Sequence, residues 1–221
     1  AHYREPMPPN DHQNLAWRAA SRLIEVTGVQ RGLHITVRKV IPLSSGLAGG
    51  SANAAAVLRG LNRLWSLGLE LGELMAIAEK LGADVPFCLL EGTARVRGIG
   101  EIVTPLPALP AWPVILLKPP VTVSTAACYA GYDRLPHGVR VNVDALVEAL
   151  AEENMVKIAG HLGNALESVT LQMFPDLIHW RQAMEKAGSL GVLMSGSGPT
   201  LFGLVRDERH GYEVFEKLAS S

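Results

Sequence analysis

The sequence has few of the features that mark several common classes of protein. It has only two cysteines, Cys88 and Cys128, which lie far apart in the chain without metal-type spacing. We therefore expect two reduced thiols in a cytoplasmic protein rather than a disulfide framework. No apolar run approaches the roughly 20 residues that a membrane helix requires, and the N-terminus lacks the charged-then-apolar pattern of a signal peptide.

Charge of one sign is also lacking. The formal net charge is −1, from 20 basic and 21 acidic residues. A protein that binds a nucleic-acid backbone or an anionic membrane normally carries a basic face, so we expect neither partner. The seven histidines show no metal-ligand spacing, and the sequence therefore predicts no transition-metal site. A length of 221 residues, 48% of them hydrophobic, suits one large globular domain or two modest ones.

What the sequence does contain is a glycine-rich loop between a predicted strand and a predicted helix. A β-branched run over residues 34–41 stops at Pro42, small residues follow, and apolar residues then recur with helical spacing up to Trp65. A helix N-terminus presents unpaired N–H groups and the positive end of the helix dipole. Many glycine turns bind nothing, but three glycines and three serines between Pro42 and Ser51 favour phosphate binding here.

The loop matches neither of the two commonest phosphate-binding motifs. No Gly-Lys-Ser/Thr closes it, and its glycine spacing is not that of the dinucleotide fingerprint. The run Pro42-x-x-x-Gly46-Leu-Ala-Gly-Gly-Ser-Ala-Asn53 instead closely resembles the central phosphate loop of the GHMP kinases, the superfamily of galactokinase, homoserine, mevalonate and phosphomevalonate kinases. Within this superfamily, the sequence most resembles the kinases of the non-mevalonate isoprenoid pathway. The segments that carry this narrower resemblance are residues 61–65, 81–87 and 100–107.

This resemblance, which runs from about Asn10 to the C-terminus, implies a fold and a reaction. The fold is α+β with two domains, a ribosomal-protein-S5-like N-terminal domain and a ferredoxin-like C-terminal domain. A proline-rich linker at 105–110 places the expected boundary, giving a nucleotide-binding domain over 1–107 and a substrate-binding domain over 108–221. The reaction is the ATP- and Mg²⁺-dependent phosphorylation of the 2-hydroxyl of a cytidine-diphosphate-linked methylerythritol. Both a monomer and a homodimer stay open.

The resemblance also assigns an ATP-binding role to particular residues. Position alone leaves a helix cap open for Asn14 and a solvated strand-end lysine open for Lys39. The residues implied to bind ATP are Asn14, Lys39, Pro42, Leu43, Ser44, Ser45, Gly46, Leu47, Ala48, Gly49, Gly50, Ser51 and Ala52.

Asp84 matches the catalytic carboxylate of the family, although an aspartate after a helix end is more often a cap. A carboxylate that accepts a hydrogen bond from the substrate hydroxyl can orient it toward the γ-phosphate and take its proton. The residues implied to bind the substrate are Asp84, Thr125, Tyr129, Gly196, Ser197 and Gly198. Tyr129 would stack on a pyrimidine or else pack into the core, and the turn around Ser197 would also fit a plain hairpin.

The resemblance has one gap. Chains of this family open with a further segment that carries a lysine beside the catalytic aspartate and a Tyr-His pair that holds the cytosine. No part of this sequence matches that segment. We therefore expect that the natural protein starts further upstream or that the chain is a fragment, with severely impaired catalysis. Two alternatives remain. One is a related kinase acting on mevalonate, homoserine or a sugar, which is disfavoured by Trp65 and by residues 83–87 and 100–107; the other is a non-catalytic nucleotide-binding module.

Hydrophobic spacing and breaking residues predict the other elements. After a loop over 1–12, with a helix start signal at Asn10 or Asp11, the pattern alternates helices and strands. Helices are predicted over 14–26, 70–81, 142–152, 157–166, 177–187 and 208–221. Strands are predicted over 33–40 and 112–117, and on either side of 98–100 and of 195–199.

Overall fold

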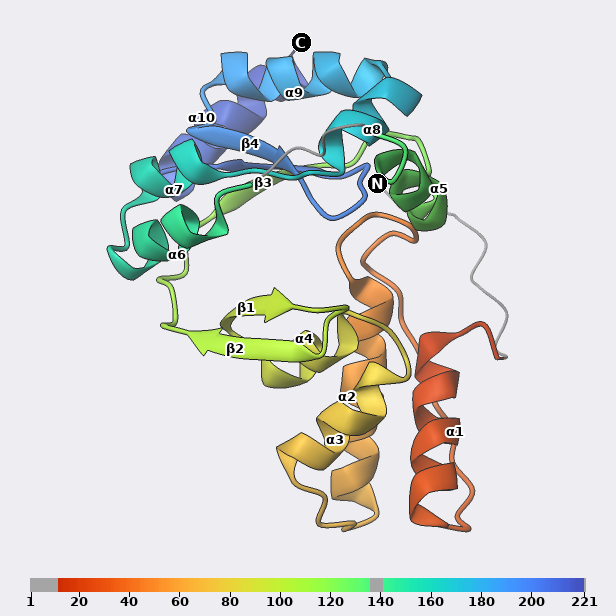
Figure 1. Ribbon diagram of the computed structural model, residues 1–221. Helices are drawn as coiled ribbons and strands as arrows, with labels where there is room; N and C mark the ends of the chain where they lie inside the picture. Colours follow the sequence, from red (N-terminus) through yellow and green to blue (C-terminus); the bar gives the residue numbers. More distant parts are fainter. Residues whose placement is uncertain (1–11, 136–140, 221) are drawn as a thin grey trace. The chain divides into compact units, whose positions relative to one another are not determined.

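The computed structural model describes residues 12–135 and 141–220 and shows an α+β protein (Figure 1). The chain divides into two compact units. Unit 1 comprises Ala1–Leu43 and Ala48–Ala108, and unit 2 comprises Ser44–Leu47 and Leu109–Ser221. The tip of the glycine loop is thus grouped with unit 2. No helix among the described residues is long and apolar enough to cross a membrane.

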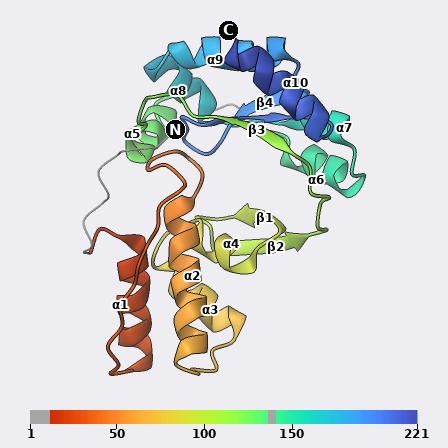
Figure 2. The same cartoon turned by 180° about the vertical axis from the view of Figure 1, so that it is seen from behind.

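Unit 1 is mainly helical. Helices α1 and α2 lie side by side, and α3 and α4 pack against each other and against α2 (Figure 2). The side chains of Leu23, Leu58 and Leu89 are fully buried in the core that these helices share. The elements of unit 1 are α1 (Leu15–Thr27), α2 (Gly49–Leu64), α3 (Leu71–Glu79), α4 (Val85–Leu90) and the antiparallel hairpin of β1 (Thr93–Arg97) and β2 (Ile102–Leu106).

Helix α1 begins and ends where its sequence provides caps. The Asn14 side chain accepts a hydrogen bond from the backbone N–H of Ala16 at 3.0 Å, as an N-cap does. Gly28 ends the helix with a left-handed backbone, φ 69°, which glycine adopts without a steric penalty. The helix predicted over 14–26 is therefore confirmed, whereas the start signal at Asn10 or Asp11 lies outside the described residues.

The strand predicted over 33–40 is not formed among the described residues. Its burial alternates as in a strand, with Leu33, Ile35 and Val37 half-buried and the residues between them exposed. No strand of the described chain pairs with it, however. Alternation in sequence therefore indicated which side chains face the helices, but a strand also requires a neighbour that accepts and donates its backbone hydrogen bonds.

Unit 2 is a three-stranded antiparallel sheet with helices on both faces. The strand order is β3-β5-β4, and α9 and α10 cover one face (Figure 1). On this face Met184 of α9 packs against Met194 and Leu201 of the sheet. Helices α6 and α7 pack on the other face, against Phe202 and Leu204. The elements of unit 2 are β3 (Val114–Leu117), α5 (Thr125–Tyr132), α6 (Val143–Ala151), α7 (Met155–His161), α8 (Glu167–Met173), α9 (Asp176–Ala187), β4 (Gly191–Met194), β5 (Leu201–Leu204) and α10 (Glu208–Ala219).

The helices differ from the prediction in two stretches. The helix predicted over 157–166 is α7, which starts earlier because the Asn154 side chain caps it by accepting from Lys157 N at 3.1 Å. It ends at His161, and a separate helix, α8, follows after a break at Gly163 and Asn164. The second difference is α4, a helix of six residues in a stretch for which no helix was predicted; it contains Pro86. Proline is accommodated in its first turn.

Candidate functional site

The glycine loop runs directly into the N-terminus of α2, in unit 1. The residue before the helix, Ala48, has a left-handed backbone, φ 50°, and provides no side-chain cap. In the first turn, Gly49 and Gly50 have no side chain and Ser51 has a small one. Within the described residues, no side chain therefore caps the first turn of this 16-residue helix, and its N–H groups suit an anion.

A lysine lies beside this helix start. A Cβ atom placed on Gly49 would come within 2.9 Å of Ile41 Cγ2 and 3.2 Å of Lys39 Nζ. The ammonium group is thus held near the positive end of the helix dipole, where a second positive charge is unfavourable unless an anion accompanies it. Partial burial lowers the pKa of Lys39, which is the expected effect of removing water from a cation. The geometry favours a phosphate-binding role over that of a fully solvated lysine.

The tip of the loop is bound by the turn between β4 and β5, all within unit 2. The Ser195 hydroxyl donates to the Gly46 carbonyl oxygen at 2.9 Å, and Thr200 N donates to the Ser45 carbonyl oxygen at 3.4 Å. A Cβ atom on Gly46 would collide with the Ser195 carbonyl oxygen, and the φ of 75° also favours glycine. Gly46 is therefore required by close packing as well as by backbone conformation.

The remaining residues of the predicted ATP-binding set continue the chain through this loop. Ser45 and Ser51 are buried, with 3% and 8% of their surface exposed, so they support the loop rather than project from it. The others lead into the loop or into the first turn of α2: Pro42, Leu43, Ser44, Leu47, Ala48, Gly50 and Ala52.

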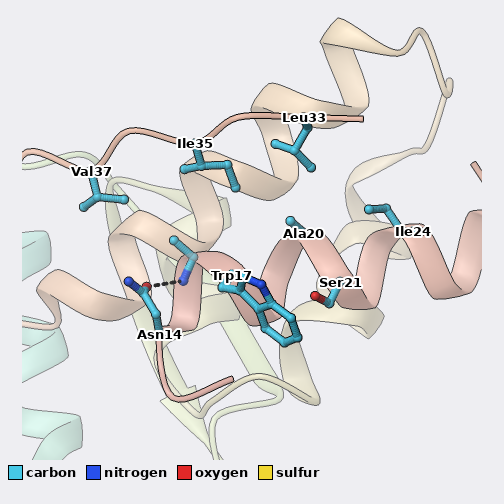
Figure 3. A pocket seen from close by; sticks show the side chains of 9 residues that line it. Asn14, Trp17, Ala20, Ser21, Ile24, Leu33, Ile35 and Val37 are labelled. Atoms are coloured by element: carbon cyan, nitrogen blue, oxygen red, sulfur yellow. Dashed lines mark hydrogen bonds between the residues drawn. The ribbon is translucent and has the colours of Figure 1, made fainter. Parts of the chain in front are cut away.

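Asn14 lies at one end of a pocket along α1. Trp17 and Ile24 line the pocket from α1, and Leu33 and Val37 from the segment that follows it; its volume is about 260 Å³ (Figure 3). Leu33, Ile35 and Val37 point toward the helix in this view. The cap hydrogen bond uses the Asn14 side-chain oxygen, so the two interpretations of this residue, as a cap and as a ligand contact through its NH₂ group, are compatible.

Asp84 stands immediately before α4 in unit 1. Its backbone is already helical, φ −88°, and its side chain makes no cap hydrogen bond. Val85 and Leu89 are fully buried and anchor this short helix, whereas Asp84 is exposed. A Cβ atom on Gly100 would collide with the Ala83 carbonyl oxygen, so the β1–β2 turn packs closely beside it. The carboxylate is thus held on a fixed backbone and is not used as the cap of the helix.

Cys88 lies one turn after Asp84 on α4. Burial raises the pKa of the Cys88 thiol, and the negative charge of Asp84 raises it further. Cys88 and Cys128 are both free thiols. No cluster of three or more His, Cys, Asp and Glu side chains that could hold a metal ion occurs in the described part of the chain.

The residues predicted to bind the substrate in unit 2 are partly brought together. The hydroxyl groups of Thr125, at the start of α5, and Ser197, in the β4–β5 turn, are hydrogen-bonded at 2.9 Å. Tyr129 follows Thr125 by one helical turn, so the two lie on the same side of α5. Tyr129 is 54% exposed and therefore does not belong to the core of unit 2.

The two glycines of the turn have the left-handed backbones that favour glycine. Gly196 has φ 57° and Gly198 has φ 85°. A Cβ atom on Gly198 would also meet Met194 Sδ at 2.5 Å. Sequence reasoning identified these glycines but missed Asn164 and Thr170, whose side chains support the turn. Neither lies in a recognisable motif, so only the fold reveals them.

Comparison with known proteins finds two family models that match separate parts of the chain. The GHMP kinases N terminal domain matches residues 14–92, and the GHMP kinases C terminal domain matches residues 144–221. The 4-diphosphocytidyl-2-C-methyl-D-erythritol kinase of Geobacillus sp. (strain WCH70) is 46% identical over 212 residues, covering 95% of this chain and 72% of that protein. The enzyme of the same name from Gloeobacter violaceus is 45% identical over 219 residues, covering 97% and 72%.

Solved kinase structures also match the fold of this chain. A crystal structure of 4-(cytidine 5'-diphospho)-2C-methyl-D-erythritol kinase matches with a TM-score of 0.80 at 39% identity, over 97% of this chain and 77% of that chain. Homoserine kinase from Cytophaga hutchinsonii also matches with a TM-score of 0.80, at 26% identity over 97% and 73%. The predicted α+β fold of the GHMP kinases is confirmed. The chain therefore belongs to the GHMP kinases, and among them to the 4-diphosphocytidyl-2-C-methyl-D-erythritol kinases.

Proposed function

We propose that this protein transfers the γ-phosphate of ATP to the 2-hydroxyl of 4-diphosphocytidyl-2-C-methyl-D-erythritol. The observation that carries the proposal is the uncapped N-terminus of α2, preceded by the glycine loop and flanked by Lys39. The relatives of the same name, 46% and 45% identical, support the choice of substrate.

The nucleotide side of the reaction uses unit 1 and the loop. The N–H groups of Gly49, Gly50 and Ser51 bind phosphate oxygens, and the Lys39 ammonium neutralises part of their charge. Asn14 contacts the adenine through its side-chain NH₂. Mg²⁺, which we expect to arrive with ATP, would supply positive charge to offset the charge that develops on the transferred phosphoryl group.

Of the residues proposed to act on the substrate, Asp84 belongs to unit 1 and the others belong to unit 2. The Asp84 carboxylate accepts a hydrogen bond from the 2-hydroxyl, orients it in line with the γ-phosphate and takes its proton. Tyr129 stacks on the cytosine, and the hydroxyl pair of Thr125 and Ser197 offers both a donor and an acceptor to the cytidine-bearing part of the substrate. The backbone of Gly196 and Gly198 lets the substrate approach closely.

A substrate comparison tests this function. ADP release should be measured with 4-diphosphocytidyl-2-C-methyl-D-erythritol, homoserine and mevalonate, and the product identified by phosphorus NMR. We expect turnover only with the cytidine-diphosphate-linked alcohol, with one new phosphomonoester signal. A higher kcat/KM for homoserine or mevalonate would assign the chain to a different reaction. ATP binding without turnover on any of the three would indicate a nucleotide-binding module.

A further inference from the structure

Every carbonyl oxygen from Met194 to Ser197 accepts a hydrogen bond. The Asn164 Nδ2 atom donates to the Met194 oxygen at 2.8 Å and to the Gly196 oxygen at 2.7 Å. The Ser195 oxygen accepts from the backbone N–H of Gly198 at 2.9 Å, and the Ser197 oxygen accepts from the Thr170 hydroxyl at 3.1 Å. This turn is therefore held by side chains from outside the β4–β5 hairpin, and Asn164 supplies two of its bonds.

The Asn164 side chain is fully determined by these contacts. Its Oδ1 atom accepts from the Leu166 backbone N–H at 2.9 Å, while both hydrogens of its NH₂ group point to the turn. An amide is the one side chain of this size that offers two donors and an acceptor together. Asn164 thus connects the start of the segment leading into α8 with the carbonyls on either side of Ser195.

Ser195 lies between the two residues that supply these carbonyls, and its side chain binds the glycine loop. Its backbone N–H donates to the Thr200 carbonyl oxygen at 2.9 Å, and its hydroxyl donates to the Gly46 carbonyl oxygen at 2.9 Å. Because Asn164 binds the carbonyl oxygens of the residues on either side, the Ser195 hydroxyl has a defined direction. The position of Gly46 therefore depends on Asn164 through Ser195.

We propose that Asn164 is a positioning residue, which fixes the Ser195 turn and through it the tip of the phosphate loop. The inference rests on the proposed function only in assigning that loop to ATP. The proposal gives Asn164 no contact with nucleotide or substrate; it acts through the Ser195–Gly46 hydrogen bond.

The turn has other supports besides Asn164, so its loss can be separated from unfolding of unit 2. Glu167 accepts from the Met194 backbone N–H at 3.1 Å and forms an ion pair with Arg181 at 3.0 Å. Thr170 holds the Ser197 carbonyl independently. Loss of Asn164 should therefore leave unit 2 folded and loosen only the segment on either side of Ser195.

Hydrogen–deuterium exchange of the Thr200 N–H, which joins the turn to the Ser45 carbonyl oxygen of the loop at 3.4 Å, measures this coupling by NMR without any ligand. We expect Asn164→Ala and Ser195→Ala each to raise the exchange rate of this N–H group about fivefold, because the turn and the loop separate more often when one hydrogen bond is lost. The double variant should exchange no faster than the faster single variant, because both changes break the same connection. Unchanged exchange in Asn164→Ala, or effects that multiply in the double variant, would overturn the proposal.

Two further variants separate the hydrogen bonds from packing and from general destabilisation. Asn164→Asp keeps the size and the acceptor for Leu166 but removes both donors, so it should match Asn164→Ala. Normal exchange in Asn164→Asp would overturn the positioning role. Asn154→Ala is the matched control: it removes the asparagine cap of α7 in the same unit and should leave the exchange of the Thr200 N–H unchanged.

Calorimetric titration with ATP links the coupling to function. Asn164→Ala should weaken ATP binding about fivefold, whereas Asn154→Ala should not. If the unchanged protein fails to bind ATP, the proposed function is wrong, and the exchange experiment still decides the role of Asn164. If ATP binds and Asn164→Ala binds it equally well, the positioning proposal is wrong and the proposed function stands.

Discussion

At the scale of single residues, the structure distinguishes between two roles for Asp84, that of a helix cap and that of a catalytic group. An aspartate at a helix start normally accepts a hydrogen bond from the second or third N–H of the helix. Asp84 makes no such bond, because its own backbone is already in the helical region. Its carboxylate is exposed on a segment that Val85 and Leu89 hold in place. Position in the sequence favoured a cap, and the structure favours a group that is free to meet a ligand.

Replacement of Asp84 by asparagine should cost turnover far more than substrate binding. Asparagine keeps the size and can still contact the hydroxyl, but it cannot take the proton. We expect kcat to fall by about 10²- to 10⁴-fold, the usual contribution of a general base, with KM within a few-fold of its original value. Steady-state kinetics with the cytidine-diphosphate-linked substrate measures both.

Asp207 provides the control for that experiment. It is also an aspartate at a helix start, but it caps α10 by accepting from His210 N at 2.8 Å. Asparagine is as good an N-cap as aspartate, so Asp207→Asn should retain full activity. If Asp84→Asn behaves like Asp207→Asn, Asp84 is not the catalytic carboxylate.

The reactivity of Cys88 should report the charge of Asp84. Because burial and the Asp84 carboxylate raise the pKa of this thiol, less of it is thiolate at a given pH than for an exposed cysteine. Alkylation by iodoacetamide should therefore reach its half-maximal rate at a higher pH than in a model peptide. In Asp84→Asn the profile should move toward lower pH. Cys128 is fully buried, so it should stay unmodified and serve as an internal reference. A profile that Asp84→Asn leaves in place would show that the two groups are not coupled.

At the scale of elements, sequence predicted those whose signals are local. The helix over 14–26 is confirmed with its cap at Asn14, and the helix predicted from 142 is confirmed with a cap at Asn142. Both elements carry their start signals within a few residues. The strand over 33–40 could not be decided in this way, because a strand depends on a partner elsewhere in the chain.

The candidate site was likewise predictable only where its residues lie in a continuous stretch of sequence. The glycine loop and Asp84 lie in continuous motifs, which made them visible in the sequence. Asn164 was instead assigned to the end of a predicted helix, because its neighbours have helical spacing. Its amide bonds to Met194 and Gly196, 30 and 32 residues away, and the chain leaves the helix before it. Long-range hydrogen bonds of this kind have no local signal.

The start of α2 offers a matched pair of glycines for a test of the phosphate loop. Gly49→Leu should abolish ATP binding, because its side chain would occupy the space next to Lys39 and Ile41 at the helix N-terminus. A Cβ atom placed on Gly60, in the same helix, would instead meet no neighbouring atom within 4 Å. Gly60→Ala should retain ATP affinity and stabilise the protein by up to about 1 kcal/mol through helix propensity.

Isothermal calorimetry and thermal unfolding decide this pair together. Circular dichroism should show the same helix content in both variants and in the unchanged protein. A folded Gly49→Leu variant with normal ATP affinity would rule out phosphate binding at this helix start.

At the scale of the whole molecule, the residues proposed to bind ATP and those proposed to bind the cytidine group belong mainly to different units. The helix start and Lys39, which we assign to ATP, belong to unit 1, whereas Thr125 and Tyr129, which we assign to cytidine, belong to unit 2. Only the tip of the loop, Ser44–Leu47, is grouped with unit 2 while the rest of the loop is grouped with unit 1. A change in the cytidine contacts should therefore leave ATP affinity intact.

Tyr129→Ala tests this separation. Because the ring is half exposed, its loss should create no cavity in the core and leave the melting temperature nearly unchanged. It should weaken binding of the cytidine-diphosphate-linked substrate by about 1–3 kcal/mol, the value of one base–aromatic stack, and leave ATP binding unchanged. Tyr129→Phe should keep the stack and the affinity. Tyr212, 71% exposed on α10 of the same unit, supplies the control, since Tyr212→Ala should affect neither ligand. Equal losses for both ligands in Tyr129→Ala would mean that the ring supports the fold of unit 2, and that the specificity for cytidine lies elsewhere.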